Sequence, residues 1–486
     1  MVEQISGKKA VTNMLWRLAE RFGAQGVTVI VEIVLARVLD PQVYGIVALI
    51  TVFTTILQVF VDSGLGTALI QKKDADQLDF SSVFYTNLII CFILYCCMFI
   101  AAPVIAAFYE MSDLTPLIRF TSLILVISGV KNVQQAYVSR HLLFRKFFFA
   151  TLGGTVGAAV LGIWMACQGF GAWALVAQMI FNQAVDTLIL WITVKWRPTK
   201  EYSFERVRNL FSYGWKLLAS SLLDTLATDL RSLIIGKMYT EADLAYYNRG
   251  RTFPQFLTNN TNSAINSVLL PVMSKAQDDT TIVKAMTRRA IKTSSYLIWP
   301  LMLGLAACAE PLVSFLLTDK WLPSVLFLRI FCITFAFYPI HTANLNAIKA
   351  MGRSDIFLKL EVLKKIVSFA VLFSTMWFGV EVMAYSLLFS SICSQIINSW
   401  PNKKLLGYSY IDQLKDIIPS ILLSSIMALC IYPIRLLKMP NLVTLFIQVI
   451  AGIIVYYMGS RIFKFESFFY IKNMISQFFI RRKKLS

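Results

Sequence analysis

The sequence has few charged residues for its length. Only 15% of its 486 residues are Asp, Glu, Lys or Arg, whereas soluble domains carry about 25%. The deficit extends along the whole chain, because apolar runs repeat from Thr12 to Phe463. A soluble domain with a single anchor is therefore excluded. We expect an all-α membrane protein, since a helix satisfies its own backbone hydrogen bonds inside the bilayer.

The residues and motifs of common catalytic centres are also scarce or missing. The chain has only two histidines, and its eight cysteines lie in apolar runs without a CxxC pair, which indicates buried thiols rather than disulfides or a metal site. No GxxxxGK[ST], HExxH or GxSxG motif is present, which argues against a built-in ATPase, zinc protease or serine hydrolase. We therefore expect no metal and no cofactor, and a carrier rather than an enzyme.

Fourteen apolar segments are long enough to cross the hydrocarbon core, which takes about 20 helical residues. They are 12–37, 43–70, 80–108, 115–138, 148–167, 170–194, 213–238, 252–274, 291–317, 322–348, 357–378, 380–400, 417–436 and 441–463. The first segment contains Arg17, Glu20 and Arg21, which the apolar core of a cleavable signal peptide would not carry. We expect this segment to remain in the mature protein.

The distribution of charge predicts the orientation. The net charge is +19, but the basic residues lie between the apolar runs, so no nucleic-acid partner is expected. If the N-terminus is cytoplasmic and the segments alternate, most of the 46 Lys and Arg residues fall on the cytoplasmic side. The positive-inside rule then places both termini in the cytoplasm.

A polar stretch near the middle divides the chain. Within it, Phe204, Val207, Leu210 and Phe211 share one helical face, which predicts an amphipathic helix on the inner surface of the membrane. The predicted domains are an N-terminal six-helix bundle (1–194), an amphipathic linker (195–212), a second six-helix bundle (213–402), and helices 13 and 14 with a basic tail (403–486).

The two bundles carry a weak internal repeat at an offset of about 200 residues. Trp-Arg-Leu at 16–18 recurs as Trp-Lys-Leu at 215–217, and Leu-Ala-Arg at 35–37 recurs as Ile-Gly-Lys at 235–237. Because each bundle has an even number of segments, the halves would share one orientation. This predicts a parallel repeat about an axis along the membrane normal.

Charges inside the apolar segments indicate function, because each costs roughly 2.5–3.5 kcal/mol at the bilayer centre. They are Arg17, Glu20, Arg21 and Glu32; Arg119 and Lys131; and Asp224, Asp229 and Arg231. We interpret them as lining a hydrophilic cleft, with Glu32, Asp224 and Asp229 as candidates for ion coupling. Arg17 and Arg119 could instead reach the headgroups from segment ends, and Asp229 could be a structural partner of Arg231.

Several local motifs resemble a known family. They are LARVLDPQVYG at 35–45, DSGLGTALIQ at 62–71, LAYYNR at 244–249, LPVMS at 270–274 and AMGR at 350–353. Together they resemble the polysaccharide transporter branch of the multidrug/oligosaccharidyl-lipid/polysaccharide exporter superfamily. Members of this branch are flippases of O-antigen, capsule and exopolysaccharide assembly.

The resemblance implies alternating access around a central cationic cavity in the bacterial inner membrane. It also implies an oligosaccharide on undecaprenyl pyrophosphate as substrate, and polysaccharide polymerase machinery as a possible partner. A pyrophosphate needs Arg or Lys donors. The candidate substrate-binding residues are Arg17, Arg21, Arg119, Lys131 and Arg231.

Two other functions remain open at this stage. A cation-coupled drug exporter of the same superfamily would be expected to have an acidic cavity, whereas the charges within the segments are predominantly basic. A membrane glycan polymerase would be expected to have a large outer loop, and the predicted outer loops are short.

Overall fold

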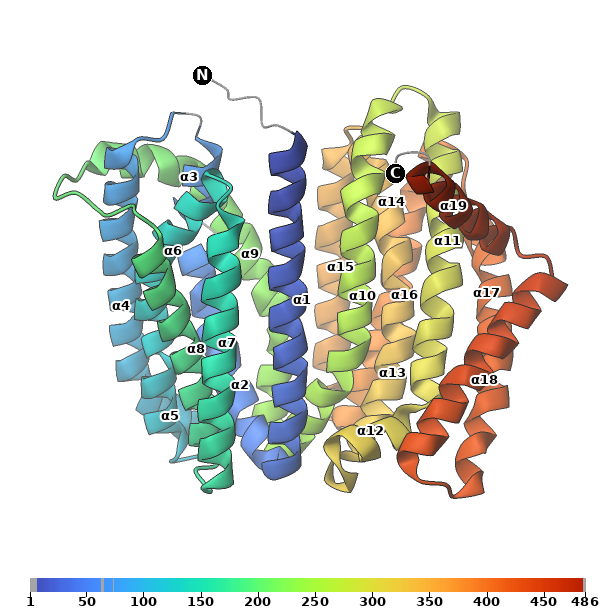
Figure 1. Ribbon diagram of the computed structural model, residues 1–486, viewed down its shortest axis with the longest axis horizontal. Helices are drawn as coiled ribbons and strands as arrows, with labels where there is room; N and C mark the ends of the chain where they lie inside the picture. The colour runs from blue at the N-terminus through green and yellow to red at the C-terminus, as the bar shows by residue number, and fades with distance from the viewer. Residues whose placement is uncertain (1–6, 63–64, 73, 484–486) are drawn as a thin grey trace. The chain divides into compact units, whose positions relative to one another are not determined.

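The computed structural model describes residues 7–62, 65–72 and 74–483, except for the side chains of residues 7–15, 17–22, 213, 216, 475 and 477–483. All regular elements in these ranges are helices. The contacts group the chain into two compact units, Met1–Ala245 and Tyr246–Ser486, called the first and second unit below. The helices within each unit run side by side (Figure 1).

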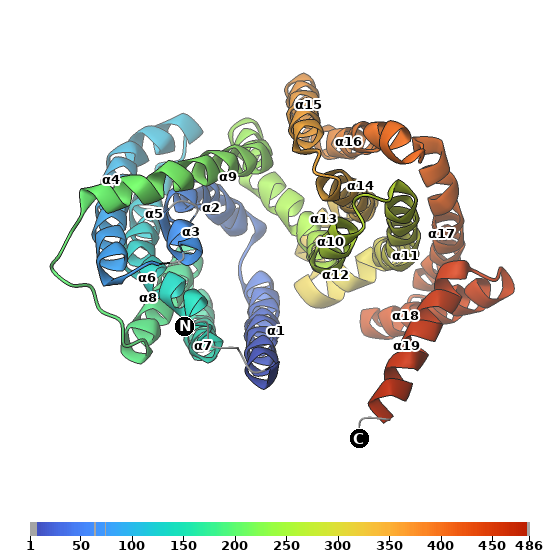
Figure 2. The same ribbon diagram turned by 90° about the horizontal axis from the view of Figure 1, so that it is seen from above.

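The described residues of the first unit form nine α-helices, and a tenth begins near the end of the unit. They are α1 (Gly7–Val38), α2 (Pro41–Asp62), α3 (Leu65–Gln71), α4 (Gln77–Tyr109), α5 (Leu114–Thr121), α6 (Leu123–Arg140), α7 (Phe144–Cys167), α8 (Ala172–Thr193), α9 (Phe204–Met238) and α10 (Glu241–Lys275). Seen from above, α7 lies between α1 and α8, and it packs against both (Figure 2).

The second unit contains most of α10 and the remaining helices. They are α11 (Thr280–Ala307), α12 (Ala309–Leu317), η1 (Asp319–Trp321), α13 (Ser324–Ala336), α14 (Tyr338–Ala350), α15 (Ser354–Thr375), α16 (Val380–Leu406), α17 (Tyr410–Ile431), η2 (Tyr432–Leu437), α18 (Asn441–Ile462) and α19 (Glu466–Lys483). α11 is central to the packing, with contacts to α13, α14, α17 and α19.

The predicted all-α membrane fold is confirmed. In the described residues, nine helices are long and apolar enough to cross a membrane, and the pair α11–α12, bent by 67°, makes a possible tenth. The other long helices, α1, α9, α10 and α15, contain several charged residues each. The total of fourteen spans and the parallel repeat are compatible with this arrangement and stay predictions.

Besides the bent pair α11–α12 within 291–317, two predicted spans contain a short break next to side chains that explain it. The span 115–138 is interrupted between α5 and α6, where the hydroxyls of Thr121 and Ser122 donate to the carbonyls of Leu117 and Ile118 at 2.7 Å. Such bonds to the preceding turn bend helices. The span 322–348 is interrupted before α14, where Pro339 occupies the first turn and cannot continue a helical ladder.

The predicted amphipathic linker takes a different form from the one expected. An extended segment follows α8, and then α9 runs without a break from Phe204 to Met238, capped by the Ser203 hydroxyl. Val207 and Leu210 are buried in the core of the first unit, beside Trp196, whereas Phe204 is 69% exposed. The amphipathic face of residues 204–211 thus packs in part on the core of the first unit, within the first turns of α9.

The contacts group α9 with the first unit, whereas residues 213–238 are predicted to belong to the second bundle. α9 packs on α2, α3 and α4. The domain boundaries predicted at 194, 212 and 402 stay a prediction.

Candidate functional site

A buried ion pair lies inside the first unit, between α6 and α8. The Lys131 ammonium is 3.0 Å from Asp186 Oδ2 and donates to Gln183 Oε1 at 2.9 Å. Gln183 in turn donates to the Ser128 hydroxyl at 2.6 Å. Gln183 and Asp186 are one turn apart on α8, so both face Lys131. Lys131 is 8% exposed and Asp186 9%.

The polar cluster continues from the ion pair to the junction of α2 and α3. Asn132 Nδ2 donates to the carbonyl of Val61 at 3.0 Å and to Asp62 Oδ1 at 3.4 Å. A β-carbon at Gly66 would lie 2.5 Å from Asn132 Oδ1, so only glycine leaves room for this amide. The cluster therefore ties α6 to both sides of the junction.

Only one of the two carboxylate oxygens of Asp186 is engaged in the pair with Lys131. Asp186 Oδ1 is buried, and no hydrogen-bond donor for it is found among the described residues. A buried pair gains stability only when its remaining lone pairs are also satisfied. The pair therefore lacks part of the hydrogen bonding that would make it a strongly stabilising contact.

Arg119 has a different environment from Lys131, although both were predicted to bind substrate. Arg119 Nε donates to the carbonyl of Phe99 at 3.2 Å, and its guanidinium lies 4.2 Å from the centroid of the Phe99 ring. These contacts join α5 to α4. Lys131 instead joins α6 to α8, so the described contacts give the two residues different neighbours.

The other predicted residues lie on α1 and α9. The side chains of Arg17 and Arg21 fall outside the described residues, so their placement stays a prediction. Glu32 is partly buried on α1. On α9, Asp224 is exposed, Asp229 is partly buried, and Arg231 is buried with 5% exposure.

Sequence reasoning missed Asp186, the acidic member of the ion pair. A usable signal was present, because Asp186 is the one charged residue in the apolar segment 170–194. A lone carboxylate in such a segment needs a partner. The partner could not be identified, since Lys131 is 55 positions away in the sequence.

Sequence reasoning also missed a buried amide network in the second unit. Asn344 and Gln413 exchange hydrogen bonds of 2.8 and 3.0 Å, and Asn402 donates to Asn344 Oδ1 at 2.7 Å. The network joins α14, α16 and α17. Nearby on α16, both amide atoms of the buried Gln395 lack a partner among the described residues. This network is well suited to hold helices together inside a membrane.

Comparisons with known proteins connect this architecture to polysaccharide assembly. A family model described as "Polysaccharide biosynthesis protein" matches residues 34–326. The succinoglycan biosynthesis transport protein ExoT of Rhizobium meliloti (strain 1021) is 24% identical over 321 residues, which cover 66% of this chain and 65% of ExoT. The chain thus spans just under two thirds of that relative.

Two further comparisons cover more of the chain. The lipopolysaccharide biosynthesis protein WzxC of Escherichia coli (strain K12) is 22% identical over 413 residues, which cover 83% of both chains. A structure described as lipid II flippase MurJ in an inward closed conformation has a TM-score of 0.72, with 16% identity, and covers 93% of this chain and 98% of MurJ. At this identity, the similarity to MurJ concerns the fold. These comparisons confirm the predicted family and the predicted all-α membrane fold.

Proposed function

This chain belongs to the polysaccharide biosynthesis protein family, and we propose that it is a flippase for a lipid-linked oligosaccharide. The substrate is an oligosaccharide on undecaprenyl pyrophosphate, which crosses from the cytoplasmic to the outer leaflet by alternating access. The product serves the synthesis of a cell-surface polysaccharide. The family match carries the proposal, because it covers more than half of the chain.

The similar proteins support the same class of activity. ExoT is described as a transport protein of succinoglycan biosynthesis, and WzxC as a lipopolysaccharide biosynthesis protein. The MurJ-like fold supports a carrier rather than a polymerase, because the chain matches a flippase over nearly its whole length. The chain is a multi-pass membrane protein, and we propose the bacterial inner membrane as its location.

Basic residues within the helices would bind the pyrophosphate. Arg21 and Arg231 are the principal candidates, with help from Arg17, Arg119 and Lys131. Arg231 is 5% exposed and Lys131 is 8% exposed, so a phosphate that reached them would be shielded from water. Charge-assisted hydrogen bonds are stronger in such surroundings.

Transport would be coupled to an ion through carboxylates in the same helices. Glu32, Asp224 and Asp229 are the candidates, with Glu32 first because it lies past the middle of the predicted span 12–37. Asp186 joins them, since the structure pairs it with Lys131 at 3.0 Å. Protonation of Asp186 would release Lys131 toward an anionic substrate, which would link ion binding to substrate binding.

The orientation can be tested with reporter fusions. Fusions after Lys200 and after Ser486 are expected to report a cytoplasmic location, because most basic loops would then face the cytoplasm. A periplasmic signal at either position would rule out the proposed topology.

The function can be tested in proteoliposomes. The purified protein is reconstituted with a fluorescent undecaprenyl-pyrophosphate oligosaccharide, and a membrane-impermeant quencher reports how much substrate has changed leaflet. Flipping well above that of empty vesicles is expected, with no change in glycan length. If the substrate stays in its leaflet under every imposed gradient, or if the glycan is lengthened, the proposed function is wrong.

A further inference from the structure

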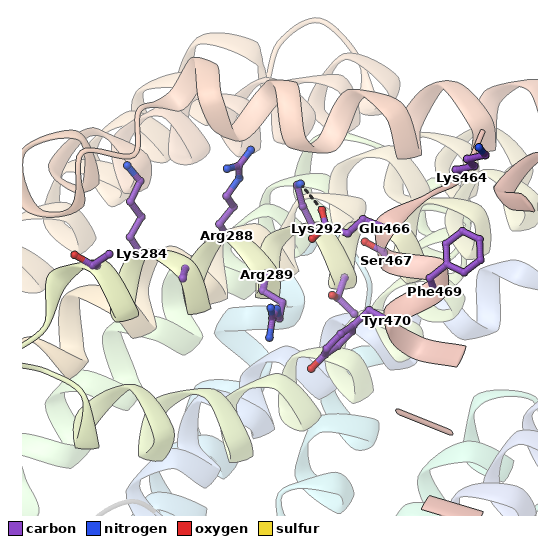
Figure 3. Close-up of a pocket in the computed structure, with 12 residues that line it drawn as sticks. Lys284, Arg288, Arg289, Lys292, Lys464, Glu466, Ser467, Phe469 and Tyr470 are labelled. Carbon is purple, nitrogen blue, oxygen red and sulfur yellow. Dashed lines mark hydrogen bonds and ion pairs between the residues drawn. The ribbon is translucent and has the colours of Figure 1, made fainter. Parts of the chain in front are cut away.

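A basic groove lies between the first half of α11 and α19, in the second unit. Its volume is about 820 Å³. Five basic side chains line it, namely Lys284, Arg288, Arg289, Lys292 and Lys464. Lys284, Arg288 and Lys292 recur every four residues, so they project from one face of α11 (Figure 3).

The acidic groups at the groove neutralise only part of this charge. Asp416 accepts hydrogen bonds from Arg288 at 2.7 and 2.8 Å, and it lies 3.5 Å from Lys292. Glu466 accepts from Lys292 at 2.9 Å, and this bond holds the pKa of Glu466 below its ordinary value. Hydrogen bonds from Ser409 lower the pKa of Asp412, which also lies close enough to Lys284 for that ammonium to help lower it. The five cations of the groove outnumber the carboxylates beside them, so the groove keeps a net positive charge.

Arg289 and Lys464 are the cations best placed to meet a ligand. The Arg289 guanidinium lies 5.0 Å from the centroid of the Tyr470 ring. Stacking occupies the face of a guanidinium and leaves the N–H groups at its edge available. Lys464 lies just before α19 and completes the rim of the groove.

An apolar groove follows directly along α11. It has a volume of about 570 Å³ and is lined by side chains of α11, α17 and α18, including Leu297, Leu301, Val449 and Ile453. Tyr296 lines the apolar groove and is its α11 residue nearest in sequence to Thr293 of the basic groove. Its hydroxyl is 2.7 Å from the Ser460 hydroxyl, and its ring packs on Phe465 at 5.9 Å between centroids.

We propose that the two grooves together bind an anionic phospholipid of the membrane. The headgroup phosphate would lie in the basic groove, and the acyl chains would follow the apolar groove. The two grooves fit the two parts of such a lipid. A phosphate needs several cationic donors, and acyl chains need an apolar surface. The bound lipid would fasten α19 to α11. This inference does not depend on the proposed transport activity.

The apolar groove indicates that the phosphate belongs to a lipid. A free phosphate ester would use only the basic groove, whereas a lipid explains why the apolar groove begins where the basic residues end. Anionic lipids are abundant in the cytoplasmic leaflet and attract basic segments near the membrane surface. The predicted orientation places the basic groove on that side.

Native mass spectrometry of the full-length protein in neutral detergent would test the assignment. The protein is titrated with phosphatidylglycerol and, separately, with phosphatidylcholine. The groove variant is Arg289→Gln/Lys464→Gln, which leaves the partners of Asp416 and Glu466 in place. The control is Lys403→Gln/Lys404→Gln, which removes the same charge from exposed positions at the end of α16.

The wild-type protein is expected to prefer phosphatidylglycerol. The groove variant is expected to bind it roughly 25-fold more weakly, at about 1 kcal/mol per basic residue, while the control stays within about twofold. Glu466→Gln removes a competing carboxylate and is expected to tighten binding about fivefold. A purely structural groove would not produce that gain.

Three outcomes would overturn the assignment. Equal losses in the groove and control variants would show binding to general surface charge. Displacement of phosphatidylglycerol by an equal concentration of glycerol phosphate would show a site for a free phosphate ester. Displacement by a trace of undecaprenyl pyrophosphate would assign the grooves to that lipid instead.

Discussion

Gly45 of α2 packs directly against the main chain of Glu241 at the start of α10. A β-carbon at position 45 would lie 1.9 Å from the carbonyl oxygen of Glu241 and 2.9 Å from its α-carbon. Both residues belong to the first unit. The two helices can approach this closely only because residue 45 has no side chain.

Gly45→Ala is therefore expected to destabilise the protein by about 1–3 kcal/mol, the usual cost of overpacking. The measurement is thermal unfolding in detergent. Gly26→Ala is the matched control, because a β-carbon there meets nothing within 4 Å. It should be neutral or stabilise α1 by about 0.5–1 kcal/mol, the helix preference for alanine over glycine. Similar melting curves for both variants would contradict the close approach.

Breaking the Lys131–Asp186 pair is expected to cost about 3–5 kcal/mol, because a buried charge would lose its partner. Lys131→Met and Asp186→Leu should each lower the melting temperature. The double variant should recover most of the loss, since neither charge then remains buried. If transport is measured on the same samples, the double variant should be stable and inactive. Full activity in the double variant would make the pair purely structural.

Arg21→Ala and Arg231→Ala are each expected to abolish polymer export while the protein remains in the membrane. The reason is that each change removes a donor to the pyrophosphate. Export is measured as surface polysaccharide in a strain lacking the chromosomal gene, and membrane content by immunoblot. Lys403→Ala, at an exposed site, is the control. Normal export by both arginine variants would show that they have structural roles.

Glu32→Gln is expected to weaken the response of flipping to an imposed proton or sodium gradient more than it weakens substrate binding. The amide keeps the shape of the side chain but cannot carry a charge. The measurement compares flipping with and without each gradient in proteoliposomes. If the flipping rate of the unmodified protein does not change with either gradient, the coupling hypothesis is wrong.

The start of α4 is expected to lose stability in acid. Asp76 forms a capping box with Asp79 and pairs with Arg206 at 2.6 Å. The hydrogen bond from the Asp79 backbone, followed by the Arg206 contact, holds the pKa of Asp76 below its ordinary value of 3.8. A depressed pKa gives stability that is present above 3.8 and is lost as the pH falls through the folded-state value.

Asp76→Ala should therefore cost about 1 kcal/mol near neutral pH, the usual value of a cap, and less as the pH falls below about 4. Thermal unfolding over this range is the measurement. Asp74→Ala, two residues earlier and exposed, is the control. A difference between the variant and the unmodified protein that stays constant with pH would show that Asp76 acts without its charge.

The helical membrane fold could be predicted because its signal is local. A segment such as 80–108 is apolar over about 20 or more residues, whatever its neighbours are. The family could be recognised for a similar reason, since short motifs such as 35–45 keep their residues together in the chain. The motif contains Gly45, but the sequence does not show why glycine is needed there, which is the close approach of the Glu241 backbone.

The candidate site was only partly predictable. Lys131 and Arg119 were identified because a charge inside an apolar segment is costly. That criterion does not show that the two residues have different partners. The structure gives Lys131 a buried carboxylate and gives Arg119 a carbonyl and an aromatic ring. Asp186 was missed because the sequence alone gave no partner for it.

The sequence by itself determined that this chain is a helical membrane protein of a polysaccharide family, since hydropathy and motifs are properties of neighbouring residues. Only the tertiary structure decided that α9 runs unbroken from Phe204, that Lys131 meets Asp186 across α6 and α8, and that five cations converge beside α19. The physical reason is distance along the chain. Helix packing brings together residues that are tens to hundreds of positions apart, and a local pattern carries no information about which of its polar side chains will meet.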